Sequence, residues 1–312
     1  ALYLITPGTS AFFFSLGWAI VLDMSEKLYP LTDRGLLALV GPDAARFLNG
    51  LCTQHCLNLQ PGQAYAALQL TAQGRFMYDF LILPQPDGAL WLDCFGPTRL
   101  DLARQLHRYK LREVVEFHDL TDDFAIYAAL PGANTPVLPA GTQIVADPRL
   151  TALGQRLYVP TSAAWQPKVG TLQDYAHARI GLGVPDGAYD CTPDRSFPNE
   201  FCFGDLHAID YHKGCYLGQE LTARTHFRTQ PKKRLVQIAW TGPRPATGAV
   251  IVADGAEVGT VLSVAPATGL AHVRLAAMAA AAAGGPALRV GETTLEATKP
   301  RWAGYSLAPA EA

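Results

Sequence analysis

Cysteine is the residue type in this sequence best suited to chemistry, and one of the six cysteines has a setting of its own. Cys215 lies in the segment 213–220, KGCYLGQE, with His212 and Lys213 just before it and Arg224 downstream. Positive neighbours lower the pKa of a thiol and favour the thiolate, the form that binds iron or attacks an electrophile. The segment therefore predicts thiol or metal chemistry, although a cysteine beside a lysine is more often an inert thiol.

Glycines and positive charges surround this cysteine. Gly214 and Gly218 permit a tight turn and a close approach of a ligand to the backbone. Between Lys213 and Arg234 there are six cationic residues and one acid, Glu220. This balance favours an anionic ligand or partner, with a solvated face and ordinary turn glycines as the alternatives.

The other five cysteines are predicted to be buried thiols. They lie at positions 52, 56, 94, 191 and 202, in apolar or aromatic surroundings where a free thiol behaves as a small hydrophobe. Cys52 and Cys56 have the i, i+4 spacing of one helix, but a zinc or cluster site usually needs about four ligands. We therefore expect buried helix cysteines and no resident metal. Six cysteines are too few for a disulfide scaffold, which favours a reducing compartment.

Length and composition limit the classes of protein to which the chain can belong. Its 312 residues suffice for two or three packed units, and the 49% that are hydrophobic can bury a sizeable core. A formal net charge of −2 argues against a nucleic-acid partner. The apolar stretch 11–22 is shorter than the roughly 20 residues that cross a membrane, and it lacks the charges of a signal peptide. Residues 1–23 are interpreted as a non-native or upstream extension before Met24.

Short strands and helices alternate without the regular repeat of a doubly wound sheet. Helices are predicted after Gly41, after Gly96 and over 171–180, where Gly181 ends the pattern. A Pro-Asp-Gly turn joins the first two of the predicted strands. The strands are expected over 76–83, 89–95, 114–117, 124–129, 143–146 and 156–159. This order is typical of an α+β fold.

From Arg234 onward the sequence changes to short β-like runs separated by glycine, proline and Asp-Gly turns. One alanine-rich stretch, 276–283, favours a helix. Such a pattern is typical of a small barrel or sandwich. We place a domain boundary near residues 230 and 231, which gives an α+β body of two subdomains, 24–230, and a C-terminal β-barrel domain, 231–312.

The whole string from Lys213 to Arg224 resembles the signature of the YgfZ family, K-G-C-[FY]-x-G-Q-E-x-x-x-R, and fills every defined place. The form GQELTARTH over 218–226 is similar to the branch that includes the mitochondrial iron–sulfur assembly factor. Further family elements resemble the segments 41–53, 73–79, 179–185 and 198–200. The resemblance covers roughly residues 28–240, and the C-terminal part agrees only in its general pattern of short strands and turns.

This resemblance implies the fold of the glycine-cleavage aminomethyltransferase, two α+β units and a C-terminal β-barrel around a central opening that holds tetrahydrofolate. Glu200 is the best candidate to bind the pterin, because a carboxylate can accept two parallel hydrogen bonds from its N–H edge. Tyr78, Asp79, Arg179 and Tyr216 are weaker candidates for the same pocket.

The sequence departs from the aminomethyltransferases at their catalytic aspartate. The resemblance places that aspartate at Pro30, and a proline side chain cannot exchange a proton. Asp33 is three positions away and is expected to point differently if the strand continues. We therefore expect an accessory factor and not a one-carbon-transfer enzyme. An aminomethyltransferase-like enzyme and a non-catalytic folate-sensing scaffold stay open as alternatives.

The resemblance also implies roles and partners. Cys215 would transiently hold a cluster, iron or a sulfur adduct, while Lys213 and Arg224 would stabilise its thiolate or an acidic partner. Other motif residues would shape and orient the loop: Gly214, Tyr216, Gly218, Gln219 and Glu220. The implied partners are A-type iron–sulfur carrier proteins and [4Fe–4S] client enzymes, with no nucleic acid and no membrane. The bacterial cytoplasm is the expected location, and the mitochondrial matrix is the alternative.

Overall fold

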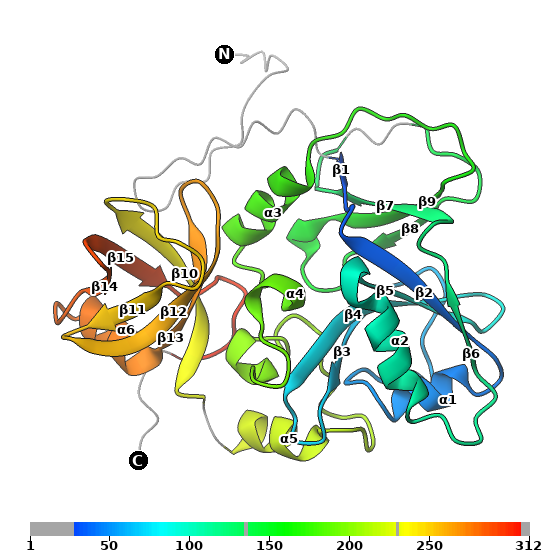
Figure 1. The fold of residues 1–312 in the computed structure, drawn as a ribbon, viewed down its shortest axis with the longest axis horizontal. Coiled ribbons are helices and arrows are strands. Elements are labelled where there is room, and N and C mark those ends of the chain that lie inside the picture. The colour runs from blue at the N-terminus through cyan, green and yellow to red at the C-terminus, as the bar shows by residue number, and fades with distance from the viewer. Residues whose placement is uncertain (1–27, 134–136, 229–230, 307–312) are drawn as a thin grey trace, which may run out of the picture.

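The computed structural model describes residues 28–133, 137–228 and 231–306. The interpretation of residues 1–23 as an extension falls outside these residues. The described chain forms two sheets, a group of short helices and a closed barrel (Figure 1). This arrangement confirms the predicted α+β class with a C-terminal β-barrel.

Five antiparallel strands form the first sheet, in the order β3-β4-β5-β2-β6. Their bounds are β2 Arg34–Val40, β3 Tyr65–Leu70, β4 Phe76–Pro84, β5 Leu90–Phe95 and β6 Glu116–Asp119. The predicted strand pair around the Pro-Asp-Gly turn is β4 and β5. Strand β6 begins later than predicted, because the N–H and carbonyl of Val114 bond to the carboxylate and N–H of Asp43 instead.

Helices α1 (Ala44–Asn49) and α2 (Arg99–His107) cover one face of this sheet, and a 3-10 turn, η1 (Gly96–Thr98), precedes α2. Leu102 and Leu106 on α2 have helical spacing and are fully buried with the sheet residues. Each such buried leucine contributes about 1.5–3 kcal/mol. The packing holds the loop after α1 in a fixed place.

The prediction that Cys52 and Cys56 lie on one helix is wrong, although both thiols are buried as predicted. Helix α1 ends at Asn49, and Cys52 forms an isolated β-bridge with Gln69. The N–H of Cys56 donates to the Asn49 side-chain oxygen at 2.9 Å. These contacts turn the chain away from a helical path, because the Asn49 side chain and the Leu68 carbonyl, which accepts from the N–H of Thr53, offer it other hydrogen bonds.

Four strands form the second sheet, in the order β1-β7-β9-β8. They are β1 Leu28–Pro30, β7 Phe124–Ala129, β8 Gln143–Ala146 and β9 Gln155–Pro160, with a 3-10 turn, η2 (Thr151–Leu153), before β9. The predicted strands over 124–129, 143–146 and 156–159 are confirmed. Leu36 and Leu68 of the first sheet share one core with Ile126 and Tyr158 of the second, so polar groups on these inner faces are shielded from water.

Four short helices lie beside the sheets: α3 Leu172–Gly181, α4 Gly187–Asp190, the 3-10 turn η3 Pro198–Phe201, and α5 Gln219–Phe227. Thr171 and Asp174 form a capping box that starts α3 where the sequence predicted. Figure 1 shows α3 and α4 between the sheets and the barrel, and α5 at the end of the β3–β4 pair.

Six strands close into a barrel in the order β10-β13-β12-β11-β14-β15. They are β10 Lys233–Thr241, β11 Val250–Ala253, β12 Ala256–Val264, β13 Gly269–Arg274, β14 Leu288–Val290 and β15 Thr293–Thr298. The alanine-rich stretch is helix α6 (Leu275–Ala282), which buries Met278 against the barrel. Of the two alternatives, barrel and sandwich, the structure has the barrel. Residues 229 and 230, beside the expected domain boundary, lie outside the described chain.

Candidate functional site

The signature segment forms an irregular loop that leads into α5. Gly218 precedes the helix with a φ of 85°, in the left-handed region. A side chain at Gly218 would also clash with the carbonyl oxygen of Thr71, so the position requires glycine. The Gln219 side-chain oxygen accepts a hydrogen bond from the N–H of Tyr216 at 3.1 Å. Gly218 and Gln219 thus fix the backbone of the loop from within.

Cys215 is the exposed thiol of this molecule. The described residues include all six cysteines, and the five others are buried. A thiol without solvent access cannot reach a partner protein, whatever its intrinsic reactivity. Cys215 is therefore the thiol that a metal centre or another protein can contact without rearrangement of the fold.

Lys213 anchors the loop to the segment after α1. Its Nζ donates hydrogen bonds to the carbonyl oxygens of Asn49, Cys52 and Gln54 at 2.7, 2.7 and 2.6 Å. It also lies 4.9 Å from the ring centre of Tyr216. Burial lowers the pKa of Lys213. Its donors are engaged with backbone oxygens, so the role of stabilising a Cys215 thiolate stays a prediction.

Arg224 and Glu220 form an ion pair on the outer face of α5. Arg224 Nη2 lies 2.6 Å from Glu220 Oε1, and both side chains are more than half exposed. Exposed pairs of this kind contribute about 0–1 kcal/mol. Either partner can therefore exchange its contact for an incoming charged group at little cost.

An open groove of about 720 Å³ runs along α5 beside the signature loop. Aromatic side chains, among them Tyr211, Tyr216 and the exposed Phe227, line it together with the cations Lys213 and Arg228. Glu220 and Arg224 complete one wall. The groove combines aromatic surface with positive charge, which suits an anionic or acidic partner.

Two other family-like segments meet the signature loop. The turn between β3 and β4 brings Gly74 so close to Gly218 that a side chain on Gly74 would press on the Gly218 carbonyl. On η3, the Asn199 amide donates to the Thr222 carbonyl at 2.9 Å and to the Thr225 hydroxyl at 2.5 Å. The folded chain thus joins segments that are widely separated in the sequence.

Glu200, the predicted pterin ligand, lies at the junction between η3 and the barrel. Its Oε2 is 3.3 Å from Nε2 of His272 on β13, and both side chains are partly buried. The His272 ring stacks on Phe201, with ring centres 5.0 Å apart. The imidazole of His272 thus faces this carboxylate without a hydrogen bond between them, and the contact of Glu200 with a pterin stays a prediction.

Tyr78 and Asp79 are neighbours on β4 and point to opposite faces of the sheet. Tyr78 packs with the core beneath α1 and α2. Asp79 lies against Gly187 of α4, where burial, together with the charge of Asp186, raises the pKa of the Asp79 carboxyl. The structure therefore separates these two candidates for a single folate pocket.

Arg179 lines a cavity of about 270 Å³ between the sheets, α3, α4 and β12. Its guanidinium donates to the Val184 carbonyl at 2.6 Å and to Asp190 at 3.1 Å. The wall carries both acids and bases as well as phenol rings: Asp33, Arg34, Arg156, Asp186, Tyr175 and Tyr189. Of the predicted pocket residues, Arg179 is the one that the described cavity wall contains; Tyr216 lines the groove along α5 instead.

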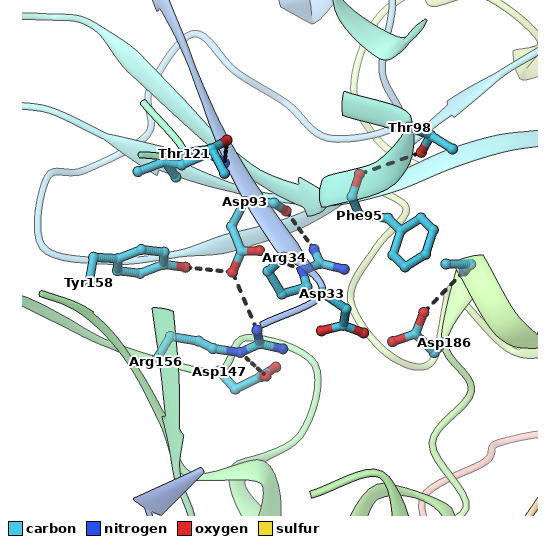
Figure 2. Close-up of polar contacts among 12 residues, drawn as sticks. Asp33, Arg34, Asp93, Phe95, Thr98, Thr121, Asp147, Arg156, Tyr158 and Asp186 are labelled. Carbon is cyan, nitrogen blue, oxygen red and sulfur yellow. Dashed lines mark hydrogen bonds and ion pairs between the residues drawn. The ribbon is translucent and has the colours of Figure 1, made fainter. Parts of the chain in front are cut away.

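A network of buried charges extends from the cavity wall into the space between the two sheets, as Figure 2 shows. Asp93 accepts from Arg34 at 2.6 Å, from Arg156 at 3.3 Å and from the Tyr158 hydroxyl at 2.8 Å. Arg156 continues to Asp147 at 3.3 Å. Buried charges need partners of this kind, because an unpaired one would lose its hydration without compensation.

Asp33 belongs to the cavity wall, which strand alternation alone did not suggest. Pro30 ends β1 opposite Tyr127, and Asp33 follows in the turn before β2. Its carboxylate accepts a hydrogen bond from Tyr189 at 3.0 Å, and burial, followed by the charge of Asp33, raises the pKa of Tyr189 to about 12. The expected alternation does not apply, because Asp33 lies in a turn and not in a strand.

Most of the cavity residues were not predicted. These residues of the cavity wall and of the adjoining charge network come from β2, β5, the loop after β8, β9, α3 and the N-cap of α4, and no motif joins them: Arg34, Asp93, Asp147, Arg149, Arg156, Tyr175 and Asp186. One signal was present, since a charged residue inside an otherwise apolar strand, such as Asp93 in LWLDCF, must have a buried partner. The sequence does not say which partner.

Within the described ranges, no three His, Cys, Asp or Glu side chains stand close enough together to hold a metal ion. In the same part of the chain, no helix is both long and apolar enough to cross a membrane.

Comparisons with known proteins give one family and one fold. Residues 232–305 match the family model described as the CAF17 C-terminal beta-barrel domain. The mouse mitochondrial iron–sulfur cluster assembly factor IBA57 is 33% identical over 244 residues, which cover 70% of this chain and 68% of the relative. The human protein of the same name is 32% identical over 261 residues, which cover 74% of this chain and 72% of the relative.

A solved structure shares the fold. The aminomethyltransferase T of the glycine cleavage system from Bartonella henselae superposes with a TM-score of 0.70, over 86% of this chain and 83% of that one. At 16% identity this similarity describes architecture alone. The mouse and human relatives are named as mitochondrial, and both the cytoplasmic location and the alternative in the matrix stay predictions for this chain.

Proposed function

Because this chain belongs to the YgfZ/IBA57 family of iron–sulfur cluster assembly factors, we propose that it supports the assembly of [4Fe–4S] clusters with Cys215 as the thiol that contacts the cluster. The observation that carries the proposal is the contrast among the cysteines: Cys215 is exposed, and the other five are buried. The loop around it is anchored on one side by Lys213 and on the other by Gln219.

Cys215 acts together with ligands from another protein. A cluster is usually held by about four thiolates, and the described residues contain no site of three or more ligands. The cluster is therefore cargo that passes between proteins, and Cys215 contributes one ligand during the exchange. An A-type carrier supplies the others, and a [4Fe–4S] client enzyme receives the product.

The groove along α5 is the proposed docking surface for the carrier. It adjoins the signature loop, and it offers Arg228 and the exposed Phe227 to an acidic partner. The Arg224–Glu220 pair is exposed, so Arg224 can turn to a carboxylate of the partner with little loss of stability.

Tetrahydrofolate is proposed to occupy the central cavity. About 270 Å³ suits the pterin end of the molecule better than the whole. Asp33 and Asp186 offer carboxylates for N–H groups, Tyr175 and Tyr189 offer aromatic surface, and Arg179 offers a positive charge. When bound, tetrahydrofolate supplies a reduced pterin that can carry a one-carbon unit. These residues fit such a ligand, and Glu200, which lies outside the cavity wall, would reach it only if the ligand extended towards the barrel.

Reconstituted transfer of a [4Fe–4S] cluster from a carrier protein tests the main proposal. Wild-type protein should accelerate the activation of a client enzyme, and Cys215→Ala should reduce this acceleration to the level without the factor. Cys94→Ala is the matched control, because the Cys94 thiol is buried beneath α2. Normal maturation by Cys215→Ala would instead favour a folate-sensing scaffold.

Calorimetric titration with tetrahydrofolate tests the cavity separately from the thiol. Asp33→Asn and Glu200→Gln should each weaken binding about tenfold to a hundredfold, since a hydrogen bond to a charged group contributes about 1.5–3 kcal/mol. Asp101→Asn, on the outer face of α2, should bind as the wild type does. Unchanged affinity of Glu200→Gln would refute the pterin contact of that residue while leaving the cavity in place.

A second candidate function is one-carbon transfer of the aminomethyltransferase kind. The observation in its favour is the Asp33 carboxylate in the cavity wall, close to the position where Pro30 replaces the expected aspartate. Turnover of methylene-tetrahydrofolate would establish this activity if Asp33→Asn removed it. Absence of turnover in folate-binding wild-type protein would exclude it.

A further inference from the structure

The segment that receives Lys213 carries two thiols in contact with each other. The Sγ atoms of Cys52 and Cys56 are 3.5 Å apart. Each thiol also points at the carbonyl oxygen of Gln54, at 3.5 and 3.3 Å. The thiols are 0% and 2% exposed, and the proposed function makes no use of them. Among the five buried cysteines, Cys52 and Cys56 are set apart by the contact between their two thiols.

The surroundings give the two thiols different proton affinities. Burial raises the pKa of Cys52, but the hydrogen bond with Cys56 and the positive charge of Lys213 outweigh it and lower the pKa overall. The hydrogen bond to Cys52 and burial raise the pKa of Cys56 well above its usual value. By contrast, burial raises the pKa of Cys94 and of Cys202 to about 12. The pair therefore contains one thiol with a lowered pKa and one with a raised pKa.

We propose that Cys52 and Cys56 form a redox-active dithiol that hydrogen peroxide converts into a disulfide, and that this bond loosens the anchor of the Cys215 loop. In the first step the Cys52 thiolate attacks one peroxide oxygen, the O–O bond breaks, and a sulfenic acid and hydroxide result. In the second step Cys56 attacks the Cys52 sulfur, and the sulfenic oxygen leaves as water with the Cys56 proton. The two thiols lose two electrons, and with a proton for the hydroxide the peroxide becomes two waters.

The fold permits both access and bond formation. Gln54 and His55 are half-buried and Leu57 is exposed, in a segment without helix or strand. A local opening of this segment is therefore enough to admit a small oxidant. A disulfide needs about 2.05 Å between the sulfurs, so the two atoms must approach by about 1.5 Å from their present separation.

This approach would disturb the Lys213 anchor. The carbonyl oxygens of Cys52 and Gln54 are two of the three acceptors of Lys213 Nζ, and both belong to the backbone that the new bond would pull. The consequence for Cys215 rests on the proposed role of the loop. Formation of the disulfide itself does not.

Peptide mass spectrometry of the full chain after peroxide treatment tests the disulfide. Cleavage after Arg and Lys leaves Cys52 and Cys56 in one fragment, 47–75, and Cys215 in another, 214–224. Fragment 47–75 should lose the mass of two hydrogens, resist alkylation, and recover both thiols with dithiothreitol. Two alkylatable thiols in this fragment, at a peroxide concentration that already oxidises Cys215, would overturn the proposal.

Variants and the alkylation rate of Cys215 test the link to the loop. In oxidised wild-type protein, Cys215 should react severalfold faster with iodoacetamide than in reduced protein. Cys56→Ser should show no such change. If Cys56→Ser does not fold, Cys52→Ser replaces it in the experiment. The control Cys94→Ser should behave as the wild type does. An unchanged Cys215 rate in protein whose disulfide has formed would refute the link. None of these measurements needs an iron–sulfur cluster, so their outcome is independent of whether the proposed function is correct.

Discussion

The buried charge network and the signature loop use polar residues for opposite purposes. In the network, Asp93 is fully buried and bonded to Arg34, Arg156 and Tyr158. In the loop, Cys215 is exposed and the polar contacts belong to its neighbours, chiefly Lys213. The first region holds charges where water cannot reach them, and the second holds a thiol where a partner can.

The difference teaches where stability and function are separated in this fold. Replacing one residue of a buried ion network leaves its partners charged and unpaired. The packing of the two sheets against each other therefore depends on every member of the network. Removing an exposed thiol leaves nothing unpaired. Substitutions in the network should therefore have large effects on stability, and substitutions in the loop should have large effects on function.

Asp93→Asn should have the largest effect on stability. It removes the negative charge that Arg34 and Arg156 share, and loss of one partner from a buried pair costs about 3–5 kcal/mol. Urea unfolding followed by circular dichroism measures the change. Asp101→Asn, which breaks an exposed pair with Arg104, is the control and should shift the midpoint far less. Equal shifts in the two variants would show that the buried network contributes no more to stability than an exposed ion pair.

Acid should weaken the network next. Although burial alone would raise it, Arg149 and Arg156 hold the pKa of the Asp147 carboxyl below its usual value, and Arg179 and Arg34 do the same for Asp186. Because these pKa values are lower in the folded state than in the unfolded state, about 3.9 for aspartate, their stabilisation is complete above about pH 4 and is lost as the pH falls through the folded pKa.

The variant Asp147→Asn isolates this effect. Its unfolding free energy should lie below that of the wild type at neutral pH, and the gap should narrow as the pH falls from 4 towards 2. A gap that stays constant with pH would show that Asp147 does not titrate in this range.

Sequence patterns found the loop and missed the network for a physical reason. The residues from Lys213 to Glu220 act as one local string, so their spacing alone identifies them. Arg34, Asp93 and Arg156 meet only after two sheets have packed together. Strand alternation and turn residues predicted most strands within a residue or two, and they could not predict which buried charge faces which.

Cys52 and Asp33 show the same limit on a smaller scale. The i, i+4 spacing of Cys52 and Cys56 predicted a helix, but Asn49 and Gln69 draw the chain out of it. Asp33 was judged by the alternation of a strand, and it lies in a turn. For Cys52, contacts with other parts of the chain override the local pattern, and for Asp33 the assumed strand had already ended at Pro30.

Gly218→Ala should have an intermediate effect, and Gly214→Ala is its control within the same motif. Gly218 has a positive φ, and its new side chain would meet the Thr71 carbonyl. Such strain costs about 1–3 kcal/mol. A side chain at Gly214 would find nothing within 4 Å, so the control should stay close to the wild type in urea unfolding. Similar destabilisation by both substitutions would mean that the loop is tighter than its contacts indicate.

Cys215→Ala should have the smallest effect on stability and should still abolish the proposed function. The thiol is exposed, and surface substitutions of this kind change stability by about 0.5 kcal/mol or less. Lys213→Met provides the contrast, because it removes the ammonium from three carbonyl oxygens and should lower the unfolding midpoint as well as cluster transfer. Urea unfolding and cluster transfer, measured on both variants, separate the chemistry of the thiol from the anchoring of its loop. If Cys215→Ala unfolded as easily as Lys213→Met, its loss of function would follow from a disordered loop, and the assignment of Cys215 as the contact to the cluster would lose its support.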